Sequence, residues 1–241
     1  MVVMTAPAKL TVSLRVVGVR DDGMHLIDAE MVSISLCDTL HIDDQATPGV
    51  TMRGVGATEL EALGTDNLVQ RALRLAGRTA HVSVDKQIPP GAGLGGGSSD
   101  AAAILRWAGF DDVTRAAELG ADVVFCLLGG RAHVTGVGEI VEPRRFENRV
   151  FTLLSPPVHC STPDVYRRWD EMGGPVDETT ANDLTPAALD LYPELEQWRR
   201  SLANASSQMP RLAGSGATWF VEGAFPGEGR RVVETFPAAG A

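Results

Sequence analysis

A glycine-rich stretch in the first half of the chain constrains the fold more than any other feature. Residues 88–102 read IPPGAGLGGGSSDAA and follow an alternating, strand-like run over 80–86, in which Val82 and Val84 would face inward. Apolar residues then recur with the spacing of one helix face, at Ala101, Ile104, Leu105 and Ala108. Gly109 is a natural end for that helix. The sequence therefore predicts the order strand, glycine loop, helix.

This order favours binding of a phosphate group. Glycine can adopt positive φ and can approach a ligand closely because no Cβ intervenes. A helix N-terminus adds unpaired N–H donors and about half a positive charge. We expect Ser98 or Ser99 to cap the helix and Asp100 to lie in its first turn, where the dipole favours negative charge. The loop is therefore predicted to hold a phosphorylated ligand.

Other glycine loops fit the sequence less well. No lysine follows the glycines as a P-loop requires, and the later signatures of protein kinases are absent. Gly91, Gly93 and Gly96 do match a dinucleotide fingerprint, with Asp111 about twenty residues further on. However, a helix that ends at Gly109 leaves no room for the second strand of such a fold. The remaining alternative is a glycine-rich surface turn without a ligand.

Composition and charge exclude some classes of protein. The chain has 241 residues, of which 44% are hydrophobic and 22% charged, as in ordinary globular proteins. Its formal net charge of −10 argues against nonspecific binding to nucleic acid. Cys37, Cys126 and Cys160 have neither metal-ligand nor disulfide-framework spacing, so we expect reduced thiols in a cytoplasmic protein. We expect no membrane partner, because neither a signal peptide nor an apolar run of about 20 residues is evident.

The remaining pattern predicts mixed α and β structure in two lobes. Strands are expected over 9–19, within 26–42, over 131–141 with a turn at 136–138, and over 150–154. Helices are expected at 112–119, 163–172, 185–191 and 194–204, and a loop at 223–229 is expected to precede a last short helix. A further helix would begin at a Thr65 cap, present Leu68, Ala72 and Leu75 on one face, and end at Gly77. A polar break at 143–148 predicts one domain over residues 1–145 and a second over residues 146–241.

Three separated motifs resemble the small-molecule kinase superfamily of galactokinase, homoserine kinase, mevalonate kinase and phosphomevalonate kinase, the GHMP kinases. They are APAKL at 6–10, the glycine loop, and LAGSGA at 212–217. Within the superfamily the chain looks most like the family of 4-diphosphocytidyl-2-C-methyl-D-erythritol kinases. The additional matches, in the same order, are RDDGMH at 20–25, GADV at 120–123, GVGE at 136–139, STPDVY at 161–166 and NDL at 182–184.

The resemblance covers residues from about 5 to 222 and implies a fold. That fold is α/β (α+β) and two-lobed, with an N-terminal domain like domain 2 of ribosomal protein S5 and a ferredoxin-like C-terminal domain. It also implies an enzyme that transfers phosphate from ATP to an alcohol in isoprenoid precursor biosynthesis.

The same resemblance implies the roles of particular residues. Asp122 would accept the proton of the acceptor hydroxyl, and Lys9 would orient Asp122 and stabilise charge on the transferring group. ATP would bind with Mg²⁺ bridging its β- and γ-phosphates, and the protein ligands of that metal are not assigned. The residues implied at the nucleotide are Asn67, Leu68, Lys86, Pro90, Gly91, Gly93, Leu94, Gly95, Gly96, Gly97, Ser98 and Ser99.

The implied acceptor is a cytidine diphosphate derivative, phosphorylated on its 2-hydroxyl. A cytosine needs a stacking surface and hydrogen-bond partners for its edge. The residues implied on this side are Thr11, His25, Thr162, Tyr166, Gly214 and Ser215. His133 and His159 match no functional position and are expected to be structural. No oligomeric state follows from the sequence.

Each assignment has a structural alternative. Lys9 could be a surface lysine, Asp122 a helix cap and Lys86 a solvated strand end. The remaining alternatives are a first-turn helix position for Asn67, core positions for Leu68 and Tyr166, simple capping for Ser98 and Ser99, and a structural role for His25.

Four positions depart from the family pattern. Met24 stands where Tyr is usual, Thr11 where Asn is usual, Ala29 where Thr is usual and Val124 where Pro is usual. We expect these changes to affect the acceptor pocket more than phosphoryl transfer. The alternatives are therefore a GHMP kinase of another small alcohol or phosphate ester, or a catalytically silent nucleotide-binding relative. Lys9 and Asp122 argue against the silent relative, which has no need of either.

Overall fold

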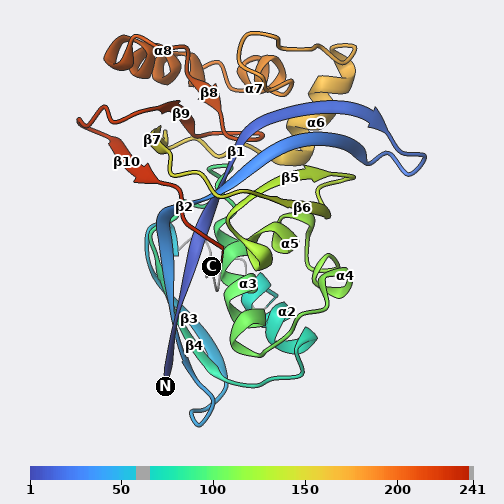
Figure 1. The fold of residues 1–241 in the computed structure, drawn as a ribbon, viewed down its shortest axis with the longest axis vertical. Helices are drawn as coiled ribbons and strands as arrows, with labels where there is room; N and C mark the ends of the chain where they lie inside the picture. Colours follow the sequence, from blue (N-terminus) through green and yellow to red (C-terminus); the bar gives the residue numbers. More distant parts are fainter. Residues whose placement is uncertain (58–65, 239–241) are drawn as a thin grey trace.

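The computed structural model describes residues 1–57 and 66–238. Their strands form two sheets (Figure 1). The first sheet contains β1 (Val2–Val19), β2 (His25–Asp43), β3 (Gly49–Gly54), β4 (His81–Lys86), β5 (Arg131–Thr135) and β6 (Ile140–Arg144). Its order is β3-β4-β2-β5-β6, with β1 paired to β2. The run predicted over 9–19 lies in β1, and a single strand, β2, stands where more than one was predicted within 26–42; the two form one antiparallel hairpin.

The β1–β2 hairpin organises this sheet. β1 pairs with one edge of β2 along almost its full length, while β4 and β5 pair with different stretches of the opposite edge. The alternation predicted for β4 is confirmed, because Val82 and Val84 are fully buried. The predicted turn at Gly136 and Gly138 joins β5 to β6.

Within residues 1–57 and 66–238, the helices beside the first sheet are α2 (Leu68–Leu75), α3 (Gly96–Trp107), α4 (Val113–Ala116) and α5 (Ala121–Leu128). The α3 helix contacts β1, α2 and α5, and its predicted apolar face is buried. Gly109 follows the helix with φ of 67°, as expected for its stop. The core of this half of the molecule therefore forms around the helix that follows the glycine loop.

The starts of two helices differ from the sequence prediction. Gly95 is the N-cap of α3 and has no side-chain cap, so Ser98 and Ser99 lie inside the first turn and do not cap it. Asp100 consequently lies one turn further along, fully buried. Asn67 caps α2, and its side chain accepts a hydrogen bond from Gln70 N. The predicted cap Thr65 lies outside the described residues.

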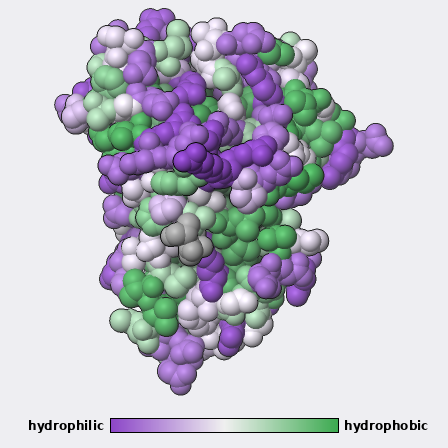
Figure 2. All heavy atoms as spheres, in the orientation of Figure 1, coloured by the Kyte–Doolittle hydropathy of each residue, from purple (hydrophilic) through white to green (hydrophobic). Residues whose placement is uncertain are grey.

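The second sheet has the order β10-β7-β9-β8 and is antiparallel throughout. Its strands are β7 (Val150–Leu154), β8 (Arg211–Leu212), β9 (Trp219–Glu222) and β10 (Arg230–Glu234). The helices α6 (Thr162–Glu171), α7 (Thr185–Leu191) and α8 (Leu195–Ser206) lie within one or two residues of their predicted positions. Figure 2 shows mostly hydrophilic side chains over this upper half of the molecule.

The last predicted helix is wrong, because β10 occupies that place and pairs with β7. Beyond β10 the chain returns to the first sheet, where Thr235 bridges to Ile34 and Ala238 bridges to Gly129. The domain division at residues 145 and 146 remains a prediction. Among residues 1–57 and 66–238, no helix combines the length and apolar character needed to span a bilayer.

Candidate active site

A cavity of about 1010 Å³ lies where the glycine loop meets β1, α5, α6 and the loop after β8. With the exception of Ser99, every site residue predicted from the sequence lines it. Those residues are Lys9, Thr11, His25, Asn67, Leu68, Lys86, Pro90, Gly91, Gly93, Leu94, Gly95, Gly96, Gly97, Ser98, Asp122, Thr162, Tyr166, Gly214 and Ser215. Residues far apart in the sequence are therefore brought to one concave surface.

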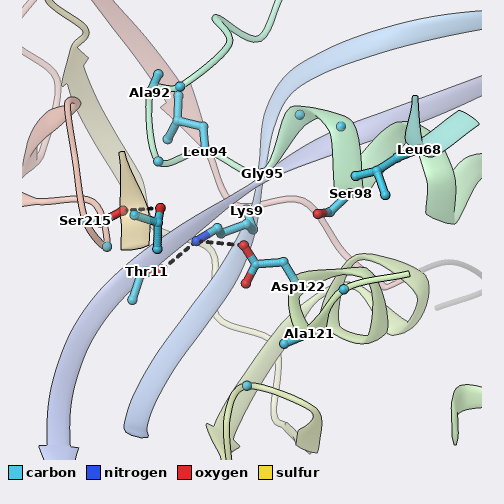
Figure 3. Close-up of a pocket in the computed structure, with 18 of the residues that line it drawn as sticks. Lys9, Thr11, Leu68, Ala92, Leu94, Gly95, Ser98, Ala121, Asp122 and Ser215 are labelled. Atoms are coloured by element: carbon cyan, nitrogen blue, oxygen red, sulfur yellow. Dashed lines mark hydrogen bonds and ion pairs between the residues drawn. The ribbon is translucent and has the colours of Figure 1, made fainter. Parts of the chain in front are cut away.

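The glycine loop presents the uncapped N-terminus of α3 to the cavity. Gly95 has φ of 68°, and a Cβ at this position would lie 2.7 Å from Cγ of Lys9. Only glycine therefore allows the lysine stem to pass so close to the loop. The Ser99 hydroxyl donates to the carbonyl of Pro7 at 2.6 Å, which ties α3 to β1, whereas Ser98 lies at the cavity (Figure 3).

Lys9 and Asp122 form an ion pair at the centre of the site (Figure 3). Lys9 Nζ lies 3.3 Å from Asp122 Oδ2 and donates to the Thr11 hydroxyl at 3.2 Å. The Lys9 side chain is only 8% exposed, so it is not a surface lysine, whereas that of Asp122 is 36% exposed. Asp122 lies in the first turn of α5, where the helix dipole favours a carboxylate. The pair thus combines a buried cation with an acceptor that solvent or a ligand can reach.

Lys86 is buried in an ionic cluster rather than solvated at a strand end. Its Nζ contacts Asp38 and lies 2.6 Å from Asp100 Oδ2. Asp38 also accepts from the backbone N–H of Ile88 at 2.9 Å, just before the glycine loop. Burial raises the pKa of Asp100 to about 7, although the Lys86 charge opposes this shift. The cluster joins β2, β4 and α3 beneath the loop.

His25 and Tyr166 face each other on the opposite side of the cavity. Their ring centroids are 4.6 Å apart, and the Trp169 ring meets His25 edge-on at 5.7 Å. His25 Nε2 lies 2.8 Å from Asp170 Oδ1, so the imidazole is held by a carboxylate as well as by the rings. Burial raises the pKa of the Tyr166 hydroxyl above its usual range. This side of the cavity therefore offers both aromatic rings and polar groups to a ligand.

The loop after β8 completes this side of the cavity. The hydroxyls of Ser215 and Thr162 are 2.7 Å apart. A Cβ on Gly214 would lie 3.6 Å from Lys9 Nζ and 3.7 Å from the Thr11 hydroxyl. The loop therefore lies beside the central ion pair.

The four departures from the family pattern fall in different places. Met24 and Thr11 line the cavity. Ala29 and Val124 are buried in the core and do not line it, so the expectation that all four affect the acceptor pocket is wrong for these two. Sequence reasoning also missed Asp38 and Asp170. A signal for Asp170 was present, since it lies four residues after Tyr166 on the same helix face.

Comparison with known proteins agrees with this geometry. The family model described as GHMP kinases N terminal domain matches residues 67–130. The 4-diphosphocytidyl-2-C-methyl-D-erythritol kinase of Paracoccus denitrificans is 38% identical over 89% of this chain and 84% of the relative. The enzyme of the same name from Polaromonas naphthalenivorans is 35% identical over 90% of this chain and 84% of the relative. This chain belongs to the 4-diphosphocytidyl-2-C-methyl-D-erythritol kinase family.

Solved structures place this family member in the GHMP kinase fold. A crystal structure of 4-(cytidine 5'-diphospho)-2C-methyl-D-erythritol kinase matches with a TM-score of 0.77 and 29% identity, covering 97% of this chain and 99% of that one. The mevalonate kinase of L. major matches with a TM-score of 0.64 at 14% identity, covering 98% of this chain and 96% of that one, which shows the shared fold alone. The predicted fold class is thus confirmed.

Proposed function

We propose that this chain transfers the γ-phosphate of ATP to the 2-hydroxyl of 4-diphosphocytidyl-2-C-methyl-D-erythritol. The observation that carries the proposal is the Lys9–Asp122 pair, which lines one cavity with both the N-terminus of α3 and the His25–Tyr166 rings. The helix N-terminus supports binding of the nucleotide phosphates, and the rings support binding of a cytosine. The family membership supports the same donor and acceptor.

The residues provide a path for the proton and for the developing charge. The acceptor oxygen attacks the γ-phosphorus, the bond from this phosphorus to the β–γ bridging oxygen breaks, and ADP leaves. Asp122 takes the hydroxyl proton, for which its partly exposed carboxylate is suited. Lys9, buried at 3.3 Å from that carboxylate, orients it and stabilises negative charge on the transferring group.

The cavity suits a magnesium ion that arrives with the nucleotide. Mg²⁺ prefers oxygen ligands and is usually bound through substrate phosphates and few protein groups. No cluster of three potential acidic, histidine or cysteine ligands exists in the described parts of the chain. The Ser98 hydroxyl, in the uncapped first turn of α3, is the protein oxygen that would hold the ion. When bound, the ion would neutralise charge on the β- and γ-phosphates.

A cytoplasmic location is part of the proposal. Cys37, Cys126 and Cys160 are free thiols, which fits a reducing compartment.

Replacing Asp122 tests the proton path. We expect Asp122→Asn to lower kcat by at least about 100-fold, because a general base contributes roughly 10²–10⁴ to the rate. ATP binding, followed by calorimetry, should remain unchanged. Asp44→Asn, the same change on an exposed turn, is the matched control and should keep wild-type kcat. An Asp122→Asn enzyme that retains most of its kcat would refute the assigned role.

A further inference from the structure

Asn182 belongs to a motif, NDL at 182–184, that the proposed reaction leaves without a role. Its side chain is buried, and the residue is 2% exposed. It does not line the cavity itself, but it contacts the loop at 213–216, whose Gly214 and Ser215 do. Asn182 therefore lies behind the loop and can affect a ligand in the cavity only through the loop's position.

Three hydrogen bonds fix the orientation of the Asn182 side-chain amide. The Asn182 amide nitrogen donates to the carbonyls of Leu212 and Gly214, both at 2.8 Å. The amide oxygen accepts from Leu184 N at 3.0 Å. Because two partners are carbonyls and the third is an N–H, only this orientation of the amide satisfies all three.

The segment around Asn182 is fixed to β1, the strand that carries Lys9 and Thr11. Leu14 N donates to the carbonyl of Ala181 at 2.8 Å, and Asp183 N donates to the carbonyl of Leu14 at 3.0 Å. The buried Asp183 carboxylate accepts from Arg15 at 2.7 Å and from Val16 N at 3.0 Å. The amide of Asn182 therefore couples the position of the loop to that of the catalytic strand.

The peptide that Asn182 holds is the one between Gly214 and Ser215. In a trans peptide the C=O and the following N–H point in opposite directions. Since the Gly214 carbonyl points to Asn182, the Ser215 N–H points away from it. Among the described residues, neither the Gly214 N–H nor the Ser215 N–H has a hydrogen-bond acceptor. Both residues line the cavity near Lys9 Nζ.

We propose that Asn182 is a positioning residue that holds the Gly214 carbonyl so that the Ser215 N–H binds an anionic oxygen of the acceptor. The inference rests on the proposed function, because the diphosphate of the acceptor supplies that oxygen. Lys9 contributes the positive charge beside it. Without the Asn182 amide, the peptide is free to rotate and the donor is lost.

Two variants test this role through kinetics. Asn182→Asp keeps the shape but removes both donors, and Asn182→Ala removes them without adding charge. We expect each to raise the acceptor KM at least about tenfold, as the loss of hydrogen bonds to a charged group implies, with the ATP KM unchanged. Asn204→Asp, on the exposed face of α8, is the matched control and should leave both KM values unaltered. A rise of both KM values in step would show a merely structural role and overturn the inference.

A binding experiment on the wild-type protein needs no variant to fold. We expect titration with cytidine 5'-diphosphate to shift the amide resonance of Ser215 in ¹H–¹⁵N spectra of the wild-type protein, because its N–H would donate to an anionic oxygen of the ligand. A Ser215 resonance that does not respond in the wild-type protein would contradict the inference. Failure of the proposed function is a separate result, since it is read as the absence of acceptor-dependent ADP formation.

Discussion

The neighbours of Lys9 fix the position of its ammonium group. Its Nζ is shared between Asp122 and the Thr11 hydroxyl, and its stem passes close to Gly95. Thr11, which departs from the family pattern, accepts a hydrogen bond from Lys9. At the scale of single residues, a threonine at position 11 therefore gives the buried ammonium group a hydrogen-bond acceptor.

The orientation of the His25 imidazole depends on its hydrogen bond with Asp170. We expect Asp170→Asn to raise the acceptor KM about two- to tenfold, because it weakens one hydrogen bond that orients the imidazole. The ATP KM and the kcat at saturating acceptor should not change. Asp164→Asn, on the same helix, is the control in the same steady-state assay, because the Asp164 carboxylate pairs with Arg167 and not with His25. Equal effects of the two variants would show that Asp170 does not act through His25.

Motifs made the central residues predictable, but not their partners. Lys9 and Asp122 could be identified because each lies in a short recognisable segment. Asp38 pairs with a lysine 48 positions away, and Asp170 with a histidine 145 positions away. Such pairs depend on strand register and on the docking of α6, which no local pattern encodes.

Among the elements, the glycine loop and α3 matter most for the proposed function. The loop also touches the second half of the molecule, since Thr218 N donates to the carbonyl of Ala92 at 3.2 Å. At Gly93, φ is 77°, and a Cβ would press on the carbonyl of Ala213 and lie 2.7 Å from that of Gly216. This glycine is therefore required for space as well as for backbone conformation.

We expect Gly93→Ala to lower the melting temperature and to weaken ATP binding, because the loop must move to accept the methyl group. Gly109→Ala separates the two causes, since Gly109 has φ of 67° but no atom of the described residues lies within 4 Å of a Cβ there. The control should lose only about 1–2 kcal/mol of unfolding free energy, the cost of the left-handed conformation, and keep its ATP affinity. Scanning calorimetry and ATP titration of both variants test this. Equal losses would mean that the contact with Ala213 is unimportant.

Elements with strong periodicity were predictable, whereas some ends were not. The helices α6, α7 and α8 lie within one or two residues of their predicted ranges. Ser98 and Ser99 favoured a later start of α3, but the left-handed Gly95 begins the helix without a side-chain cap. β10 is short, and it is a strand because β7 offers it a partner, which the local sequence does not reveal.

On the scale of the whole molecule, the site exists only because the two sheets are brought together. β1 and α5 supply Lys9 and Asp122, while α6 and the loop after β8 supply Tyr166 and Ser215. The sequence predicted two lobes, and every predicted site residue except Ser99 lines the cavity. It could not predict how the lobes meet, because that depends on long-range contacts such as those between the glycine loop and residues 213–218.

The most direct test of the central claim is ADP formation by the purified chain with Mg·ATP and single acceptors. We expect ADP release with 4-diphosphocytidyl-2-C-methyl-D-erythritol and only background release with homoserine or mevalonate. Those two acceptors have no cytosine ring that could pack against His25 and Tyr166. Release with one of the other acceptors, or no release while ATP still binds, would contradict the account.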